Sequence, residues 1–98
     1  MISGNGSAGV LIEATGATQN TVEGNYIGVN AAGTAVLGNT GSGVVIGTAA
    51  TDTTVGGGAL GSANLISGNG GSGVSIDATD ASGNTIQGNR IGTNADNT

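Results

Sequence analysis

The sequence predicts an all-β protein folded as a parallel β-helix, or β-solenoid, with three short strands per rung and about three rungs. Two repeats in the sequence predict this fold. Residues 1–34 align without a gap with residues 65–98, an offset of 64, and 20 of the 34 aligned positions are identical. Three short β-branched segments also recur in a fixed order, three times along the chain. Like segments then lie one turn apart and stack in parallel, so we expect residues 1–98 to form a single solenoid domain.

The first segment of each cycle reads Gly-Val-x-Ile, at residues 9–12, 43–46 and 73–76. Alternate side chains of a strand point to opposite faces, so the Val and the Ile of each copy should point inward. The first predicted core column is therefore Val10, Ile12, Val44, Ile46, Val74 and Ile76. Two positions further on, Ala14, Thr48 and Ala78 should also point inward.

The second and third segments predict two more core columns. The second reads Thr-(Val/Ile)-x-Gly, and the third places an Ile two residues after an Asn. No stretch shows the period of an amphipathic helix, and frequent glycine disfavours one. The second column is Val22, Val55 and Ile86, and the third is Ile2, Ile27, Ile66 and Ile91. An unpaired charge is strongly disfavoured in such a core, so Ile66→Asp should abolish folding or assembly.

Asparagines recur at fixed distances from the inner Ile of the third segment. Stacked Asn side chains can hydrogen-bond along the axis of a solenoid and satisfy the backbone at its turns. We predict one Asn ladder three residues after that Ile and another two residues before it: Asn5, Asn30, Asn69 and Asn94, and Asn25, Asn64 and Asn89. The alternative is that these amides bind sugar hydroxyls.

Outward positions of the strands form the candidate contact surface. Partly apolar outer columns can mark an interaction site, although scattered surface apolarity is common. The candidate contacts are Leu11, Val45, Tyr26, Leu65 and Arg90. Two longer connections, residues 31–42 and 58–63, contain no charged or aromatic residue, so we expect them to be spacer loops.

These repeat units resemble those of a known family. Gly-Val-x-Ile, Asn-Thr-Ile-x-Gly-Asn at residues 84–89 and Asn-Leu-Ile-Ser-Gly-Asn at residues 64–69 are similar to the right-handed parallel β-helix repeats of bacterial secreted and cell-surface proteins. Those repeats are shared with the pectate-lyase-like superfamily. The resemblance covers nearly the whole chain and implies an extracellular or cell-surface location. It leaves the activity open, because the same coil carries enzymes, adhesins and spacers.

Composition excludes several functions. The chain has no Cys and no His, which excludes disulfides, Cys or His metal sites and Ser-His-Asp catalysis. One Arg stands against six acidic residues, for a net charge of −5, so we expect no nucleic-acid partner. We expect no membrane insertion, because no apolar run approaches the roughly 20 residues of a spanning helix. The first residues also lack the basic and apolar regions of a signal peptide.

Candidate chemical sites are incomplete. Glu13 and Asp77 share a predicted outer column about two rungs, or roughly 9.6 Å, apart, with Asp80 near in sequence, but no basic residue aligns there to tune them. Residues 70–75 resemble the Gly-Gly-x-Gly-x-Asp calcium repeat, but Ser75 replaces the ligand. We therefore expect no catalytic residue, metal or cofactor. A Thr row for ice binding would consist of Thr21, Thr54 and Thr85.

The sequence shows no capping helix or polar terminal repeat, which solenoids normally need. The function we expect is a non-catalytic structural solenoid, either a fibre subunit that assembles end to end or a segment of a long exported repeat protein. Head-to-tail contacts between copies do not close and would give filaments. Two alternatives remain open: a carbohydrate-binding or polysaccharide-processing β-helix, and an ice-binding solenoid.

Overall fold

The computed structural model describes residues 1–76 and 82–92. The described residues form nine short strands and no helix. Each strand is only two or three residues long, and glycine or asparagine directly precedes eight of the nine strands. The strands are β1 (Val10–Ile12), β2 (Thr21–Val22), β3 (Tyr26–Ile27), β4 (Val44–Ile46), β5 (Thr54–Gly56), β6 (Leu65–Ile66), β7 (Val74–Ile76), β8 (Thr85–Gln87) and β9 (Arg90–Ile91).

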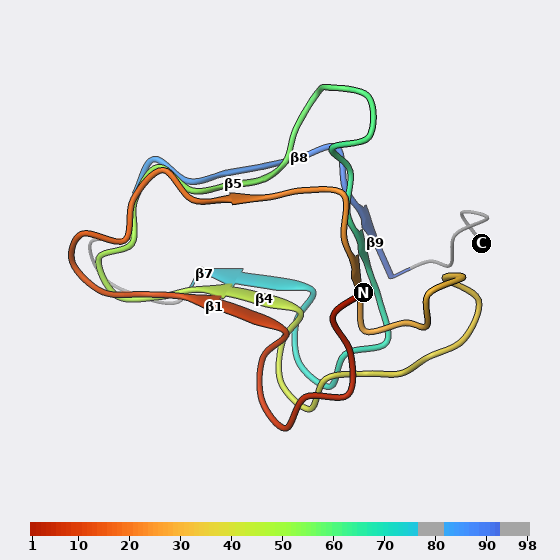
Figure 1. Ribbon diagram of the computed structural model, residues 1–98. Helices are drawn as coiled ribbons and strands as arrows, with labels where there is room; N and C mark the ends of the chain where they lie inside the picture. Colours follow the sequence, from red (N-terminus) through yellow and green to blue (C-terminus); the bar gives the residue numbers. More distant parts are fainter. Residues whose placement is uncertain (77–81, 93–98) are drawn as a thin grey trace.

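Like segments stack on one another in three parallel sheets, in the orders β1-β4-β7, β2-β5-β8 and β3-β6-β9. Figure 1 looks nearly along the coil: β5 and β8 run along one side, β1, β4 and β7 along the opposite side, and β9 along the third. The chain is thus a short parallel β-solenoid, as the repeats predict. We call β1–β3 the N-terminal rung, β4–β6 the middle rung and β7–β9 the C-terminal rung.

The register between rungs is the one that the sequence repeats predict. In the first sheet Ile12 pairs with Ile46, which pairs with Ile76. The other predicted columns also align, and an isolated parallel bridge adds Ile2 beside Ile27. Among the predicted core residues, the buried ones are Val22, Ile27, Val44, Ile46, Val55 and Ile66, with Ile2, Val10, Ile12 and Val74 packed against them.

The corner after the first strand differs from the prediction. Ala14 and Thr48 are exposed, not inward-pointing, because the chain turns immediately after β1 and β4. Ala14 has a positive φ of 95°, which ends the strand alternation on which the prediction depended. The apolar corner positions are filled by Ala17 and Ala50, which pack with the core. Ala78 lies outside the described residues.

Two loops leave the coil. After β3, Val29 and Val36 form an antiparallel bridge, and the backbone N–H of Leu37 donates to Gly28 O at 2.9 Å. The coil therefore resumes only at Asn39. The second loop follows β5 and carries the fully exposed Leu60; it is the green excursion beyond β5 in Figure 1.

Candidate functional site

One Asn ladder has the predicted members. The backbone N–H of Asn25 donates to Asn64 Oδ1 at 2.9 Å. Asn64 in turn donates from its backbone N–H and its Nδ2 to Asn89 Oδ1, at 3.0 and 2.9 Å. The buried Asn64 also donates from Nδ2 to Val22 O at 2.8 Å. These contacts support the structural role of the ladder, since they use the amide of Asn64 within the protein.

The other predicted ladder is corrected at one position. Asn30 lies in the loop after β3, where its Oδ1 accepts from the backbone N–H of Thr34 at 2.9 Å. Asn39 takes its place between Asn5 and Asn69: Asn5 Nδ2 donates to Asn39 Oδ1 at 2.8 Å, and Asn39 Nδ2 donates to Asn69 Oδ1 at 2.9 Å. The prediction of Asn30 from its spacing to Ile27 is wrong, because residues 30–38 leave the coil and the ladder position falls on Asn39. Asn94 lies outside the described residues.

A third ladder position was missed by the sequence reasoning. Asn20, Thr53 and Asn84 each precede the first residue of a strand in the second sheet, and the backbone N–H of Thr53 donates to Asn84 Oδ1 at 2.9 Å. Thr53 is fully buried, and its Oγ1 has no hydrogen-bond partner. The sequence does carry a signal for this third ladder. Asn-Thr recurs at residues 20–21 and 84–85, and Thr53 stands in the matching position of the middle rung.

The C-terminal rung exposes the ends of all three core columns. Ile76, Ile86 and Ile91 are 44%, 41% and 47% exposed, whereas their in-register neighbours Ile46, Val55 and Ile66 are 0% exposed. A hollow of about 190 Å³ opens beside this rung and is lined in part by Ile66 and Ile91. Apolar side chains that point inward are therefore accessible at this end of the described coil.

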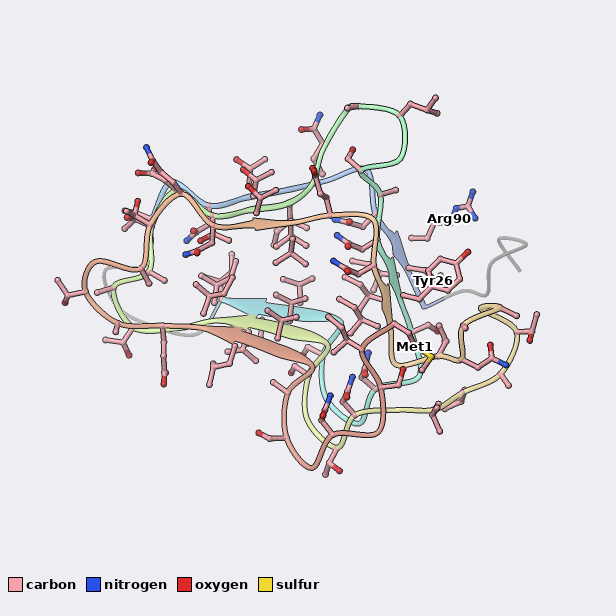
Figure 2. The ribbon with its side chains drawn as sticks, viewed as in Figure 1. Met1, Tyr26 and Arg90 are labelled. Carbon is pink, nitrogen blue, oxygen red and sulfur yellow. The ribbon has the colours of Figure 1, made fainter. Side chains whose placement is uncertain are left out.

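The outer column on β3, β6 and β9 contains Tyr26, Leu65 and Arg90 in register. Tyr26 and Arg90 are the only aromatic and the only basic residue of the chain. Together with Leu65, Ala63 and Asn64 they line a hollow of about 200 Å³. Figure 2 shows both side chains on the outer side of this sheet, with Met1 on the same side.

Leu65 does not belong to an exposed surface. It is only 3% exposed, because it lies between the longer side chains of Tyr26 and Arg90 in the same column. Leu65 is therefore the floor of the hollow and not a free contact residue. Of the other candidate contacts, Leu11 and Arg90 are exposed, and Val45 and Tyr26 are partly buried.

Hydroxyl side chains form two outer rows beside the second sheet. Thr21, Thr54 and Thr85 are in register, as the sequence predicts. Thr18, Thr51 and Ser82 form a second row through parallel bridges. The neighbouring strand positions are mixed, because Gly56 pairs with Gln87.

Acidic residues do not gather in the described part of the chain. Residues 1–76 and 82–92 contain no group of three or more His, Cys, Asp or Glu side chains placed to hold a metal ion. The suggested pair of Glu13 with Asp77, and Asp80 beside it, lies partly outside the described residues. The described part of the chain also contains no helix long and apolar enough to cross a membrane.

Comparison with known proteins adds no assignment. No family model, curated protein or solved structure matches the chain.

Proposed function

We propose that this chain is a non-catalytic structural β-solenoid whose copies stack end to end into a fibre. The observation that carries the proposal is the open C-terminal rung, where Ile76, Ile86 and Ile91 remain 41–47% exposed at the ends of continuous core columns. Within a long exported repeat protein, the same surface would instead receive the next rung. The resemblance to repeats of secreted and cell-surface proteins supports a location outside the cell.

Burial of this rung would favour assembly. Full burial of an isoleucine side chain contributes roughly 1.5–3 kcal/mol, so each half-exposed isoleucine has roughly 1 kcal/mol still to gain. The edges of β7, β8 and β9 also offer backbone hydrogen-bonding groups to another parallel strand. Within the chain, like segments stack in the same order in each rung, so a further rung of the same segments would continue the register.

A charge placed on the open rung tests the proposal. Ile86→Asp should leave the β content by circular dichroism unchanged but prevent assembly, as measured by sedimentation velocity between 1 and about 100 µM (roughly the range over which weak contacts saturate). Leu60→Asp is the matched control, because Leu60 is fully exposed on a loop. If the unaltered chain remains monomeric, or if Ile86→Asp assembles as well as Leu60→Asp, the proposal is wrong.

The hollow at Tyr26, Leu65 and Arg90 favours carbohydrate binding as a second candidate function. A tyrosine ring can stack on a sugar, and a guanidinium can pair with a carboxylate of an acidic polysaccharide. Titration calorimetry with uronic-acid oligosaccharides would test it. Binding that Tyr26→Ala weakens, but Leu11→Ala on another outer column does not, would support this candidate; no heat with any oligosaccharide would oppose it.

The two hydroxyl rows bear on the ice-binding alternative. The row of Thr18, Thr51 and Ser82 adds hydroxyl side chains to the single row that the sequence predicts. Thermal hysteresis of a dilute solution would support this candidate, particularly if Thr54→Leu abolished it. Its absence would oppose the candidate.

A further inference from the structure

Three corners join the N-terminal rung to the middle rung. At each corner a backbone N–H group of the middle rung donates to the carbonyl oxygen of an asparagine one rung earlier. The three bonds run from Thr40 to Asn5 O at 2.9 Å, from Thr54 to Asn20 O at 2.9 Å and from Leu65 to Asn25 O at 2.8 Å. We call these the first, second and third corner; their backbone bonds are alike, but their side-chain bonds differ. In Figure 1 the second corner lies at the left, just ahead of β5.

Asparagine side chains link the two rungs at the first and third corners. At the first corner Asn39 Oδ1 accepts from the backbone N–H and from Nδ2 of Asn5, at 3.0 and 2.8 Å, and Asn39 Nδ2 donates to a backbone carbonyl at 3.2 Å. At the third corner Asn64 Oδ1 accepts from the backbone N–H of Asn25 at 2.9 Å, and Asn64 Nδ2 donates to Val22 O at 2.8 Å. Each of these corners is thus joined by one buried amide that both accepts and donates.

The second corner has no such link. Thr53 stands where the other two corners have an asparagine, and its side chain carries no amide. Within the described part of the chain, the backbone N–H and the side chain of Asn20 have no hydrogen-bond partner. Thr53 is fully buried, and its Oγ1 has no partner either. The side-chain bond that is present nearby, from Thr51 Oγ1 to Thr18 Oγ1, is exposed and 3.4 Å long, so it contributes little.

The core also supports the second corner least. Three residues before the ladder asparagine stand Ile2 at the first corner, Ala17 at the second and Val22 at the third, and all three pack in the core. On the side of the middle rung the second corner again has an alanine, Ala50. Burial stabilises a fold in proportion to the apolar area removed from water, so the small alanines contribute the least.

We propose that the second corner, at Asn20 and Thr53, is an opening site, where the N-terminal and middle rungs separate before they do so at the other corners. Parts of a fold with few buried contacts open locally, at a lower free energy than global unfolding. Opening at this corner also lets water reach the Asn20 N–H and the Thr53 hydroxyl, which gives both groups the hydrogen bonds that they lack in the closed coil. The opening concerns contacts inside the chain, so it can be present or absent whether or not copies assemble.

Native-state hydrogen exchange, followed by NMR, tests this difference between corners. The amides of Thr40, Thr54 and Leu65 donate equivalent backbone bonds between the same two rungs. We expect the protection factor of Thr54 to be at least about tenfold below those of Thr40 and Leu65, which corresponds to about 1.4 kcal/mol. The Thr40 side chain is exposed and that of Leu65 is buried, so cover by the side chain would not explain slow exchange at both. Equal protection of the three amides, or the lowest protection at Thr40 or Leu65, would overturn the proposal.

A pair of variants tests the cause of the opening. Thr53→Asn supplies the missing amide, and Asn39 and Asn64 already occupy the matching buried positions of the same rung. It should raise the protection of Thr54 relative to Leu65 by at least about tenfold. Thr53→Val is the matched control: it removes the unpaired hydroxyl but gives Asn20 no acceptor, so the same ratio should change by less than about twofold.

Equal changes of this ratio in Thr53→Asn and Thr53→Val, or no rise in Thr53→Asn, would show that the missing amide does not cause the opening, and the proposal would be wrong. Circular dichroism of both variants checks that the β content is retained. If Thr53→Asn does not fold, the comparison of the three amides in the unaltered chain still decides whether the second corner opens first.

Discussion

The middle rung and the C-terminal rung contain nearly the same inner side chains, yet they differ completely in burial. Ile66 and Ile91 occupy the same column, but Ile66 is covered by a rung on each side and Ile91 by a described rung on one side only. In a solenoid each repeat contacts only its neighbours, so stability is a sum of repeat and interface contributions. The comparison teaches that the position of a core residue along the axis, more than its strand motif, decides how much it contributes to the stability of the fold.

The largest effect should come from a charge in the buried column. Ile66→Asp should unfold the protein, with a loss of more than about 4 kcal/mol, because an unpaired carboxylate would lie in a fully buried site. Ile91→Asp, one rung further along the same column, should retain the β signal in circular dichroism. Full β content for Ile66→Asp would contradict the assigned core.

The next largest effect concerns a glycine of the middle rung. Gly56 has a φ of 87°, and a Cβ there would contact the carbonyl oxygen of Gln87 and the side chain of Asn89 in the next rung. Gly56→Ala should cost about 2–4 kcal/mol in urea unfolding. Gly6→Ala is the control, since a Cβ at Gly6 has no neighbour within 4 Å, and it should change stability by less than about 0.5 kcal/mol. Equal costs for the two variants would argue against the stacked corner.

A smaller difference is expected between two asparagines that the sequence does not distinguish. Asn39 is buried and links Asn5 to Asn69, whereas Asn30 bonds within an exposed loop. Asn39→Ala should cost about 2–3 kcal/mol, because it leaves buried polar groups unpaired, and Asn30→Ala less than about 1 kcal/mol. Thermal unfolding of both variants would measure the two losses of stability. A larger loss for Asn30→Ala than for Asn39→Ala would support Asn30 as the ladder residue.

The smallest effect is a gain in stability. The buried Oγ1 of Thr53 has no partner, so Thr53→Val should stabilise the protein by about 1 kcal/mol in urea unfolding. Thr54→Val is the matched control: Thr54 lies in the outer row and is only partly buried, so its change should be near zero. A loss of stability for Thr53→Val would show that its hydroxyl has a role that the described contacts do not include.

The sequence predicted what depends on repetition and missed what depends on departures from it. The strand register followed from the aligned Val and Ile positions, because period-two alternation orients each short strand. Ala14 was misplaced because its positive φ turns the chain at the corner, and Asn30 was misplaced because a loop displaces it from its column. The burial of Leu65 depends on its neighbours Tyr26 and Arg90 in adjacent rungs, which only the stacked structure brings beside it.

Electron microscopy of the purified chain at micromolar concentration tests the central claim most directly, namely that the open rung of this solenoid is an assembly surface. The account predicts unbranched filaments with an axial repeat of about 4.8 Å, the spacing of stacked parallel strands. Monodisperse particles of single-chain size at every concentration would contradict it.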